Sequence, residues 1–253
     1  MSGGPQPRTR AERLAVADAI ANRILSLHPD VIAVGLYGSL ARGSDGPYSD
    51  VETLCVLPGH GQEYNYEWTC GPWKAEVNFY SRDNLLCKAA EVVGDWPLTH
   101  GAYRDLRPLY DPGQFLAQVH QTVLSQPPEK FTTAIKAVIV GELYEWVGKL
   151  RNIQAGGSTA YLPELALNMA KYGAFIIGLD NRHLYTTGPR LLEEALNLPG
   201  RPAGFDALCC MTMQGDLSNA GRIGEAAEAF WAGVEQWAAE RNICLEESNV
   251  IPF

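Results

Sequence analysis

The residues best suited to chemistry are the pair Gly38-Ser39 and, after ten further residues, the segment Asp50-Val51-Glu52. Gly38 and Ser39 follow the apolar stretch 31–37, which predicts a buried strand that ends in a tight turn. A second apolar run begins with the two carboxylates at alternate positions. Side chains two residues apart on a strand point to the same face, with Cα atoms about 6.5 Å apart. Asp50 and Glu52 can therefore bind one hard cation together.

The turn between these two predicted strands is suited to bind phosphate. Backbone N–H groups at Gly38 and Ser39 can donate to phosphate oxygens, and the short helix expected to follow favours anions at its N-terminus. Arg42 can clamp phosphate oxygens with its guanidinium group, although an arginine in this place can equally be solvated. Because Mg²⁺ takes carboxylates, waters and substrate phosphates as ligands, the combination indicates nucleotidyl transfer. The alternative is a strand pair with two surface carboxylates.

The Gly-Ser and Asp-x-Glu pattern resembles the signature of the DNA polymerase β-like nucleotidyltransferase superfamily. The flanking motifs make the chain similar to the kanamycin nucleotidyltransferase family, whose members modify the 4′ hydroxyl of aminoglycosides. This resemblance runs nearly from end to end. The motifs that carry it are Tyr37–Arg42, Asp45–Asp50, Glu67–Thr69, Trp73–Phe79, Asp95–Gly101, Glu142–Glu145, Gly148-Lys149, Arg151–Ile153, Tyr185–Thr187 and Ile251–Phe253.

The resemblance implies a role for each matching residue. Asp50 and Glu52 would hold Mg²⁺, and Glu145 would be the base that accepts the proton of the attacking hydroxyl, a contribution of roughly 10²–10⁴ in rate. Lys149 would contact the triphosphate of ATP, the co-substrate. The residues implied in nucleotide binding are Gly38, Ser39, Arg42, Ser49, Lys149 and Thr187. Those implied in binding the acceptor are Glu67, Lys74, Glu76, Asp95 and Glu142.

The residues alone leave the role of the 142–149 segment open. On a helix, Glu142, Glu145 and Lys149 fall within about 60° of one another. Such a face can be merely solvated, with an i,i+4 pair from Glu145 to Lys149 worth ~0.3 kcal/mol. The chain also departs from the family here, since Gly141 stands where the family has a glutamate. This departure bears on the range of acceptors and not on the base.

A second carboxylate competes with Glu145 for the role of base. Glu76 lies on the strand predicted over residues 73–80, with Lys74 and Asn78 on the same face. Polymerase β-like enzymes often place a third carboxylate on a neighbouring strand. We favour Glu145 as the base, and Glu76 then joins Glu67 and Asp95 as an acceptor of substrate ammonium groups.

Composition limits the partners and the location of the chain. The 253 residues carry a net charge of −9, which suits a small polycation better than a polymeric phosphate, so no nucleic-acid partner is expected. The sequence shows no apolar run of about 20 residues and no secretory signal, so no membrane partner is expected and the predicted location is the cytoplasm. The six cysteines lack the spacing of metal-binding motifs, and we expect them to be reduced thiols.

The hydrophobic patterns predict an α+β protein. Residues 1–127 form a nucleotidyltransferase domain with a mixed sheet and flanking helices, and residues 128–253 form an up-down helical bundle. A capping box at Thr9 and Glu12 starts a helix over 10–27. Strands are expected over 31–37, 51–57, 73–80 and 107–110, a helix over 84–93, and a loop between residues 57 and 73. Long helical stripes follow Pro127-Pro128.

These inferences converge on one activity. The chain is expected to transfer AMP from ATP to the 4′ hydroxyl of aminoglycosides such as kanamycin, tobramycin and amikacin, as a homodimer whose active sites are shared between subunits. Two alternatives stay open: transfer to another acceptor, such as a lincosamide or a protein hydroxyl, and a non-catalytic nucleotide-binding protein of the antitoxin kind. Turnover with release of pyrophosphate would separate the last alternative from the others.

Overall fold

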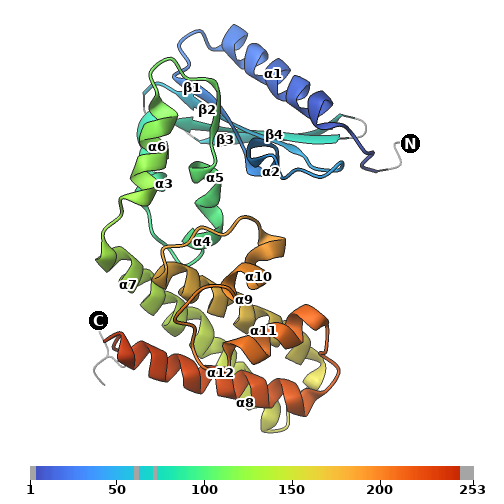
Figure 1. Ribbon diagram of the computed structural model, residues 1–253, viewed down its shortest axis with the longest axis vertical. Helices are drawn as coiled ribbons and strands as arrows, with labels where there is room; N and C mark the ends of the chain where they lie inside the picture. Colours follow the sequence, from blue (N-terminus) through green and yellow to red (C-terminus); the bar gives the residue numbers. More distant parts are fainter. Residues whose placement is uncertain (1–3, 60–62, 71–72, 246–253) are drawn as a thin grey trace. The chain divides into compact units, whose positions relative to one another are not determined.

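The computed structural model describes residues 4–59, 63–70 and 73–245. The motif Ile251–Phe253, which contributed to the resemblance, lies outside the described residues. The chain divides into two compact units (Figure 1). The first contains the residues up to Glu91 and the segment His100–Gln126, and the second contains Val92–Thr99 and the residues from Pro127 onward.

The first unit is built on a five-stranded mixed sheet in the order β3-β4-β2-β1-β5 (Figure 1). Only β2 and β4 run parallel, and the other neighbours are antiparallel. The strands are β1 (Ala33–Tyr37), β2 (Val51–Leu57), β3 (Tyr64–Cys70), β4 (Trp73–Ser81) and β5 (Arg107–Tyr110). The helices of this unit are α1 (Arg10–Leu27), α2 (Gly38–Arg42), α3 (Arg82–Ala90), α5 (Gly101–Arg104) and α6 (Phe115–Leu124).

The two faces of this sheet have different partners. Helix α1 packs on one face, where Ala21 and Ile24 join Val34, Cys55 and Val77 in a buried cluster. The alternate residues of the strands point to the other face, as the two-residue period of a strand requires. There, a side chain at Gly35 would meet Leu106, Leu116 of α6 and Leu54, so this face is packed by α6 near β1. The polar side chains of interest below lie on this second face.

The sequence analysis was wrong about the segment between residues 57 and 73. Residues Tyr64–Cys70 form the edge strand β3, paired antiparallel to β4, where a loop was predicted. The aromatic side chains alternate along this strand, and Tyr64 stacks on Phe79 at a centroid distance of 4.6 Å. Glycines on both sides of the segment suggested a loop, whereas the aromatic alternation within it is the strand signal.

The other predicted elements of this unit are present with small differences at their ends. The capping box of α1 is confirmed, because Thr9 and Glu12 exchange hydrogen bonds, with Thr9 N donating to Glu12 at 2.8 Å. Ser81 caps α3, which ends at Ala90 and not at Val93. Strand β1 begins at Ala33, two residues later than predicted. The edge strand β5 has the predicted bounds.

The second unit is helical. Its longer helices are α7 (Pro128–Val138), α8 (Tyr144–Gln154), α9 (Leu162–Asp180), α11 (Phe205–Gln214) and α12 (Ala220–Glu240). Its short elements are α4 (Trp96–Thr99), α10 (Leu191–Ala195) and two 3₁₀ turns, Thr159–Tyr161 and Gly188–Arg190. Helix α9 is buried along most of its length and contacts α4, α7, α8, α10, α11 and α12. The predicted α+β class, with a mixed N-terminal sheet and a helical C-terminal region, is confirmed.

The first predicted helix of this unit contains an irregular turn. Residues Ile139–Leu143 form a π-helical segment between α7 and α8. The helix is therefore continuous through this segment, but its register changes locally.

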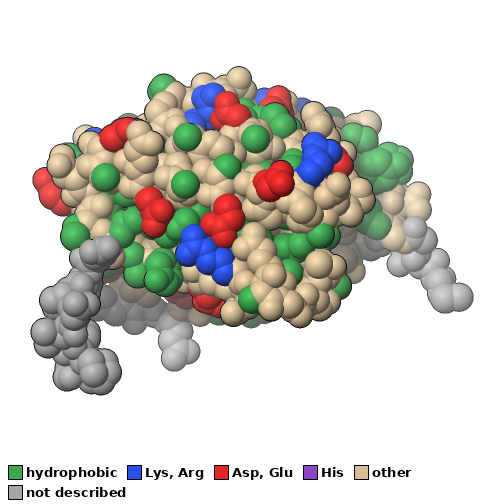
Figure 2. Space-filling model, turned by 90° about the horizontal axis from the view of Figure 1, so that it is seen from below, with side chains coloured by type: hydrophobic (Ala, Val, Ile, Leu, Met, Phe, Trp, Pro, Cys, Tyr) green, Lys and Arg blue, Asp and Glu red, His purple; other side chains and the backbone are tan. Residues whose placement is uncertain are grey.

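Acidic, basic and hydrophobic side chains are mixed on the face shown in Figure 2. In the part of the chain that the structure describes, no helix combines the length and apolar character needed to cross a membrane.

Arginines of α1 hold the loop that connects α2 to β2. Arg10 and Arg13 both form ion pairs with Asp45, and the side chains of Arg13 and Asp45 are only 3% and 2% exposed. Arg13 also donates to the carbonyl of Pro47 at 3.1 Å. Burial tends to raise the pKa of Asp45, but the hydrogen bond from Arg13 and the charges of both arginines hold it below its usual value. This contact fixes the loop immediately before Ser49 and Asp50.

Replacing Asp45 with asparagine is expected to lower the free energy of unfolding by about 3 kcal/mol, because the buried Arg13 guanidinium loses its counter-charge. Urea denaturation near neutral pH measures this change. The lowered pKa of Asp45 means that its stabilisation is present above the unfolded pKa and is lost as pH falls through the folded pKa. Asp18→Asn, an exposed change on the same helix, should cost less than about 0.5 kcal/mol. Equal unfolding energies for Asp45→Asn and the parent would contradict the expectation.

Candidate active site

A row of polar side chains crosses the sheet on the face opposite to α1. The register pairs Tyr37 with Glu52, Glu52 with Glu76, and Glu76 with Glu67. Directly paired residues on neighbouring strands point to the same face. The row therefore brings together one tyrosine and three glutamates from β1, β2, β4 and β3.

Asp50 and Glu52 lie at the start of β2 as the sequence predicted. Asp50 directly precedes the strand and Glu52 is its second residue, and both are partly buried. Burial, followed by the charges of Asp50 and Glu76, raises the pKa of Glu52 to about 7, against the opposing effect of Arg42 and Lys74. The carboxylates are thus close enough to disfavour each other's charge.

Gly38 is required where α2 begins. Its φ is +71°, a conformation that favours glycine, and a Cβ atom at this position would overlap Oε2 of Glu52. The backbone of the Gly38-Ser39 turn therefore lies directly against the Glu52 carboxylate. The turn and the carboxylate pair predicted from the sequence belong to one site.

Arg42 and Ser49 flank this site, and each already interacts with another residue of the protein. Arg42 pairs with Asp105 at 3.3 Å, and its side chain is 15% exposed. The Nε atom of Arg42 is buried and has no hydrogen-bond partner among the described residues. The Ser49 hydroxyl accepts a hydrogen bond from the Gly46 N–H at 3.0 Å. Arg42 keeps hydrogen-bonding capacity for an anion, whereas Ser49 closes the turn that leads to Asp50.

Lys74 connects two of the predicted acidic residues. Its Nζ atom forms an ion pair with Glu67 and lies 3.8 Å from Asp50. The hydrogen bond to Glu67 raises the pKa of Lys74, so the lysine stays charged. Lys74 thereby offsets part of the negative charge at this edge of the sheet.

Glu76 is held by two residues that the sequence analysis did not select as site residues. Its Oε1 atom accepts hydrogen bonds from the Tyr37 hydroxyl and from the Asn78 amide, the latter at 3.3 Å. Strand alternation places Asn78 on the same face as Glu76, which is the only sequence signal for it. No local pattern connects Tyr37 to Glu76, because they are brought together by pairing of β1, β2 and β4.

The donor set at Asp50 and Glu52 fits a magnesium ion. Among the described residues, no three His, Cys, Asp or Glu side chains converge in a metal-binding arrangement. Mg²⁺ is commonly held by one or two carboxylates, and its other ligands are waters and substrate phosphates. The pKa of Glu52 is raised first by burial and then by the negative charges of Asp50 and Glu76, and a cation at this position would offset those charges.

The second unit carries the other predicted catalytic residues. Glu145 and Lys149 form the expected i,i+4 ion pair, with 2.6 Å between Oε1 and Nζ. Both are on α8, and their side chains are 61% and 39% exposed. Lys149 also lies over the ring of Trp146, 4.2 Å from its centroid. These two residues are therefore presented on the surface of the helical unit.

Asp95 and Glu142, predicted to bind the acceptor, line one pocket of about 420 Å³ in this unit. Lys171 and Tyr172 also line it. Burial raises the pKa of Tyr172 to about 12, together with its hydrogen bond to Glu142. Sequence reasoning did not single out Lys171 or Tyr172. The only feature of the sequence that could have pointed to these two residues was their position on a predicted helix.

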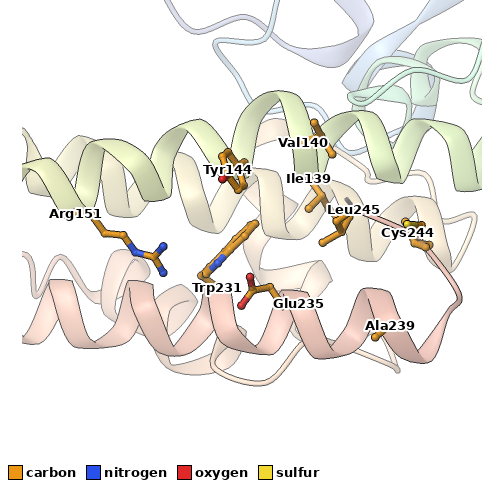
Figure 3. Close-up of a pocket in the computed structure, with 10 residues that line it drawn as sticks. Ile139, Val140, Tyr144, Arg151, Trp231, Glu235, Ala239, Cys244 and Leu245 are labelled. Atoms are coloured by element: carbon orange, nitrogen blue, oxygen red, sulfur yellow. The ribbon is translucent and has the colours of Figure 1, made fainter. Parts of the chain in front are cut away.

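Two further features of this unit lie apart from that pocket. Thr187 precedes the 3₁₀ turn Gly188–Arg190, where its carbonyl accepts from Arg190 N at 3.1 Å, and it does not line the pocket. A second cavity of about 790 Å³ lies between α8 and α12, where Tyr144 and Trp231 meet edge to face (Figure 3). The cavity is not lined by any predicted site residue among the described ones.

The predicted site residues thus fall into two groups, one in each unit. The first unit holds Gly38, Ser39, Arg42, Ser49, Asp50, Glu52, Glu67, Lys74 and Glu76. The second unit holds Asp95, Glu142, Glu145, Lys149 and Thr187.

The raised pKa of Glu52 predicts a pH-dependent stability. The folded state binds a proton at Glu52 more tightly than the unfolded state, so this stabilisation is present below the unfolded pKa and is lost as pH rises through about 7. Between about pH 5 and about pH 8, the Tm of the Glu52→Gln variant should therefore fall less than the Tm of the parent. At about pH 8 the variant should have the higher Tm of the two. Thermal unfolding followed by circular dichroism, without divalent cations, measures both.

The control for this prediction is Glu129→Gln, an exposed change in the second unit that should leave the pH dependence of the parent unaltered. A parent and a Glu52→Gln variant with parallel Tm curves over this pH range would contradict the assigned cause. Asp50→Asn should move the Glu52 transition to lower pH, because one of the repelling charges is removed.

Comparison with known proteins agrees with the motifs. Two family models match the chain: the nucleotidyltransferase domain over residues 17–93 and the KNTase C-terminal domain over residues 113–244. The aminoglycoside nucleotidyltransferase (4') of a Bacillus species is 45% identical over 251 residues, and that of Staphylococcus aureus is 44% identical over 251 residues. Each alignment covers 99% of both chains.

A solved structure shares the fold at much lower identity. The nucleotidyltransferase-like protein from Exiguobacterium sibiricum 255-15 is 12% identical, with a TM-score of 0.50, over 88% of this chain and 75% of that chain. The resemblance inferred from the motifs is confirmed by the full-length relatives. The chain is a nucleotidyltransferase and belongs to the aminoglycoside nucleotidyltransferase (4') family.

Proposed function

We propose that the chain transfers AMP from ATP to the 4′ hydroxyl of aminoglycosides such as kanamycin, tobramycin and amikacin, with release of pyrophosphate. The observation that carries the proposal is the contact of the Gly38 turn with the Glu52 carboxylate, beside Asp50, in a chain whose full-length relatives are named for this acceptor. A phosphate-binding turn and a carboxylate pair on one sheet face are the parts that the donor side of the reaction needs.

The donor nucleotide would bind at this turn. Gly38 and Ser39 offer N–H groups to the phosphates, and Ser49 offers its hydroxyl proton, since the oxygen accepts from Gly46. Arg42 has an unpaired Nε for an anion. Asp50 and Glu52 would hold Mg²⁺, which when bound neutralises charge on the triphosphate. Lys149 and Thr187, carried by the second unit, complete the proposed nucleotide contacts.

The acceptor side would rely on Glu145. In the proposed reaction the hydroxyl oxygen of the aminoglycoside forms a bond to the α-phosphorus, the bond from that phosphorus to pyrophosphate breaks, and Glu145 takes the hydroxyl proton. Glu145 is paired to Lys149 at 2.6 Å and its side chain is 61% exposed, so its carboxylate is accessible to a hydroxyl. Glu76 is the weaker candidate for base, since its Oε1 already accepts two hydrogen bonds.

The substrate-binding residues are proposed to recognise the ammonium groups of the drug. Two of these carboxylates, Glu67 and Glu76, lie opposite each other on β3 and β4. The other two, Asp95 and Glu142, line the pocket of the second unit. Carboxylates bind ammonium groups by charge-assisted hydrogen bonds, the strong class of such bonds. Lys74, which pairs with Glu67 and lies 3.8 Å from Asp50, would hold these two carboxylates in place beside the drug.

The active enzyme is proposed to be a homodimer with shared sites. The metal carboxylates are on the first unit, and Glu145 and Lys149 are on the surface of the second. In a two-fold dimer, each cleft would take Asp50 and Glu52 from one subunit and Glu145 and Lys149 from the other. This arrangement is carried over from the family resemblance.

The activity is tested by incubating the protein with ATP, Mg²⁺ and tobramycin and measuring pyrophosphate. Asp50→Asn should reduce the rate more than tenfold, a barrier change above about 1.4 kcal/mol, because the cation loses a charged ligand. Glu129→Gln serves as the surface control. Dibekacin, which has no 4′ hydroxyl, and a lincosamide test the position and class of acceptor. Absence of pyrophosphate with every aminoglycoside would refute the proposal, whatever the variants do.

Complementation tests the shared site. Asp50→Ala and Glu145→Ala are each expected to be inactive, and mixing them under conditions of subunit exchange should restore activity, because a mixed dimer has one cleft with both residues intact. If each active site is instead formed by a single chain, every site in the mixed dimer carries one of the two substitutions, and the mixture stays inactive. A mixture that stays inactive after exchange has been verified by native mass spectrometry would show that Glu145 serves its own chain.

A further inference from the structure

Tyr37 of β1 reaches across β2 to a carboxylate on β4. Tyr37 pairs with Glu52 between β1 and β2, and Glu52 pairs with Glu76 between β2 and β4. The hydroxyl of Tyr37 nevertheless donates a hydrogen bond to Oε1 of Glu76. Glu52 instead lies against the backbone of Gly38. The two glutamates that share a register position are therefore held by different partners.

Asn78 completes the contact. Its Nδ2 atom donates to the Tyr37 hydroxyl oxygen at 2.7 Å and to Oε1 of Glu76 at 3.3 Å. The backbone of Glu76 is fixed as well, since its carbonyl accepts from the Thr53 hydroxyl at 2.7 Å. Both side-chain donors converge on Oε1 of Glu76, and among the described residues no side chain donates a hydrogen bond to its Oε2 atom.

Tyr37 remains a hydrogen-bond donor at any ordinary pH. Burial raises its pKa well above the usual value, and the hydrogen bond to Glu76 and the nearby charges of Glu76 and Glu52 raise it further. A phenol that stays protonated keeps donating to the carboxyl oxygen of Glu76, and a hydrogen bond from a hydroxyl to a carboxyl oxygen is short and directional. The Tyr37 contact is thus a permanent constraint on the Glu76 side chain.

We infer that Tyr37, with Asn78, is a positioning residue for the acceptor: it fixes Glu76 through Oε1 so that Oε2 receives an ammonium group of the aminoglycoside. The inference rests on the proposed function, in which Glu76 binds the acceptor. Without the phenol, the Glu76 carboxylate rotates toward the other groups of the row, and the acceptor loses an oriented partner. The nucleotide contacts at Gly38 and Arg42 do not depend on this hydrogen bond.

Tyr37→Phe removes the hydroxyl and keeps the ring. The dissociation constant for tobramycin, measured by calorimetry, is expected to rise about tenfold, while that for ATP with Mg²⁺ stays within about twofold of the parent. Asn78→Ala should have a similar effect, and the double variant should be little weaker than either single variant, because both act on one oxygen. Tyr66→Phe, a tyrosine exposed on the other face of the sheet, is the matched control and should bind both ligands as the parent does.

Two measurements distinguish positioning from general stability. In a Glu76→Ala background, Tyr37→Phe should cause no further loss of tobramycin affinity, whereas a structural role would weaken binding in both backgrounds. A crystal structure of Tyr37→Phe should show the Glu76 carboxylate turned from its position in the parent, and this readout needs no turnover. An unmoved Glu76, or equal losses in the presence and absence of Glu76, would overturn the inference. Absence of pyrophosphate release by the parent would count against the proposed function alone.

Discussion

Mutual repulsion of carboxylates on one sheet face is the constraint on which the rest of the site depends. Asp50, Glu52 and Glu76 lie close enough that burial and neighbouring charge raise the pKa of Glu52 to about 7. The fold offsets this repulsion with several separate contacts, including the Lys74 ion pairs and the hydrogen bond from Tyr37 to Glu76. An excess of negative charge remains at these carboxylates, and a bound cation would neutralise it.

The scaffold keeps Asp50 and Glu52 in place by tying down the segment that precedes them. The positive φ of Gly38 lets the turn approach Glu52 without a side chain in the way. Further along the chain, the buried ion pair of Arg13 with Asp45 anchors the loop before Asp50 to α1. Breaking a buried pair leaves an uncompensated charge, so the loop has little freedom to move away. Precision in a site on loops requires such support.

The helical unit presents its functional groups differently. Glu145 and Lys149 are paired at the surface of α8, while Asp95 and Glu142 line a pocket with Lys171 and Tyr172. The π-helical segment Ile139–Leu143 sits directly before α8 and changes the register between α7 and the residues that follow. Such segments change which side chains share a helix face, and they are frequent at functional sites. The helical periodicity used in the sequence analysis does not describe this turn.

Local patterns in the sequence determined much of this protein. The capping box of α1 and the alternation that puts Asp50 and Glu52 on one face depend only on neighbours along the chain. Only the tertiary structure decided that β3 is a strand, that Glu67, Glu76 and Glu52 form one row, and that Tyr37 reaches Glu76. The reason is physical: alternation sets the face of a side chain, but its partner across the sheet depends on strand order and register, which are set by contacts between distant segments.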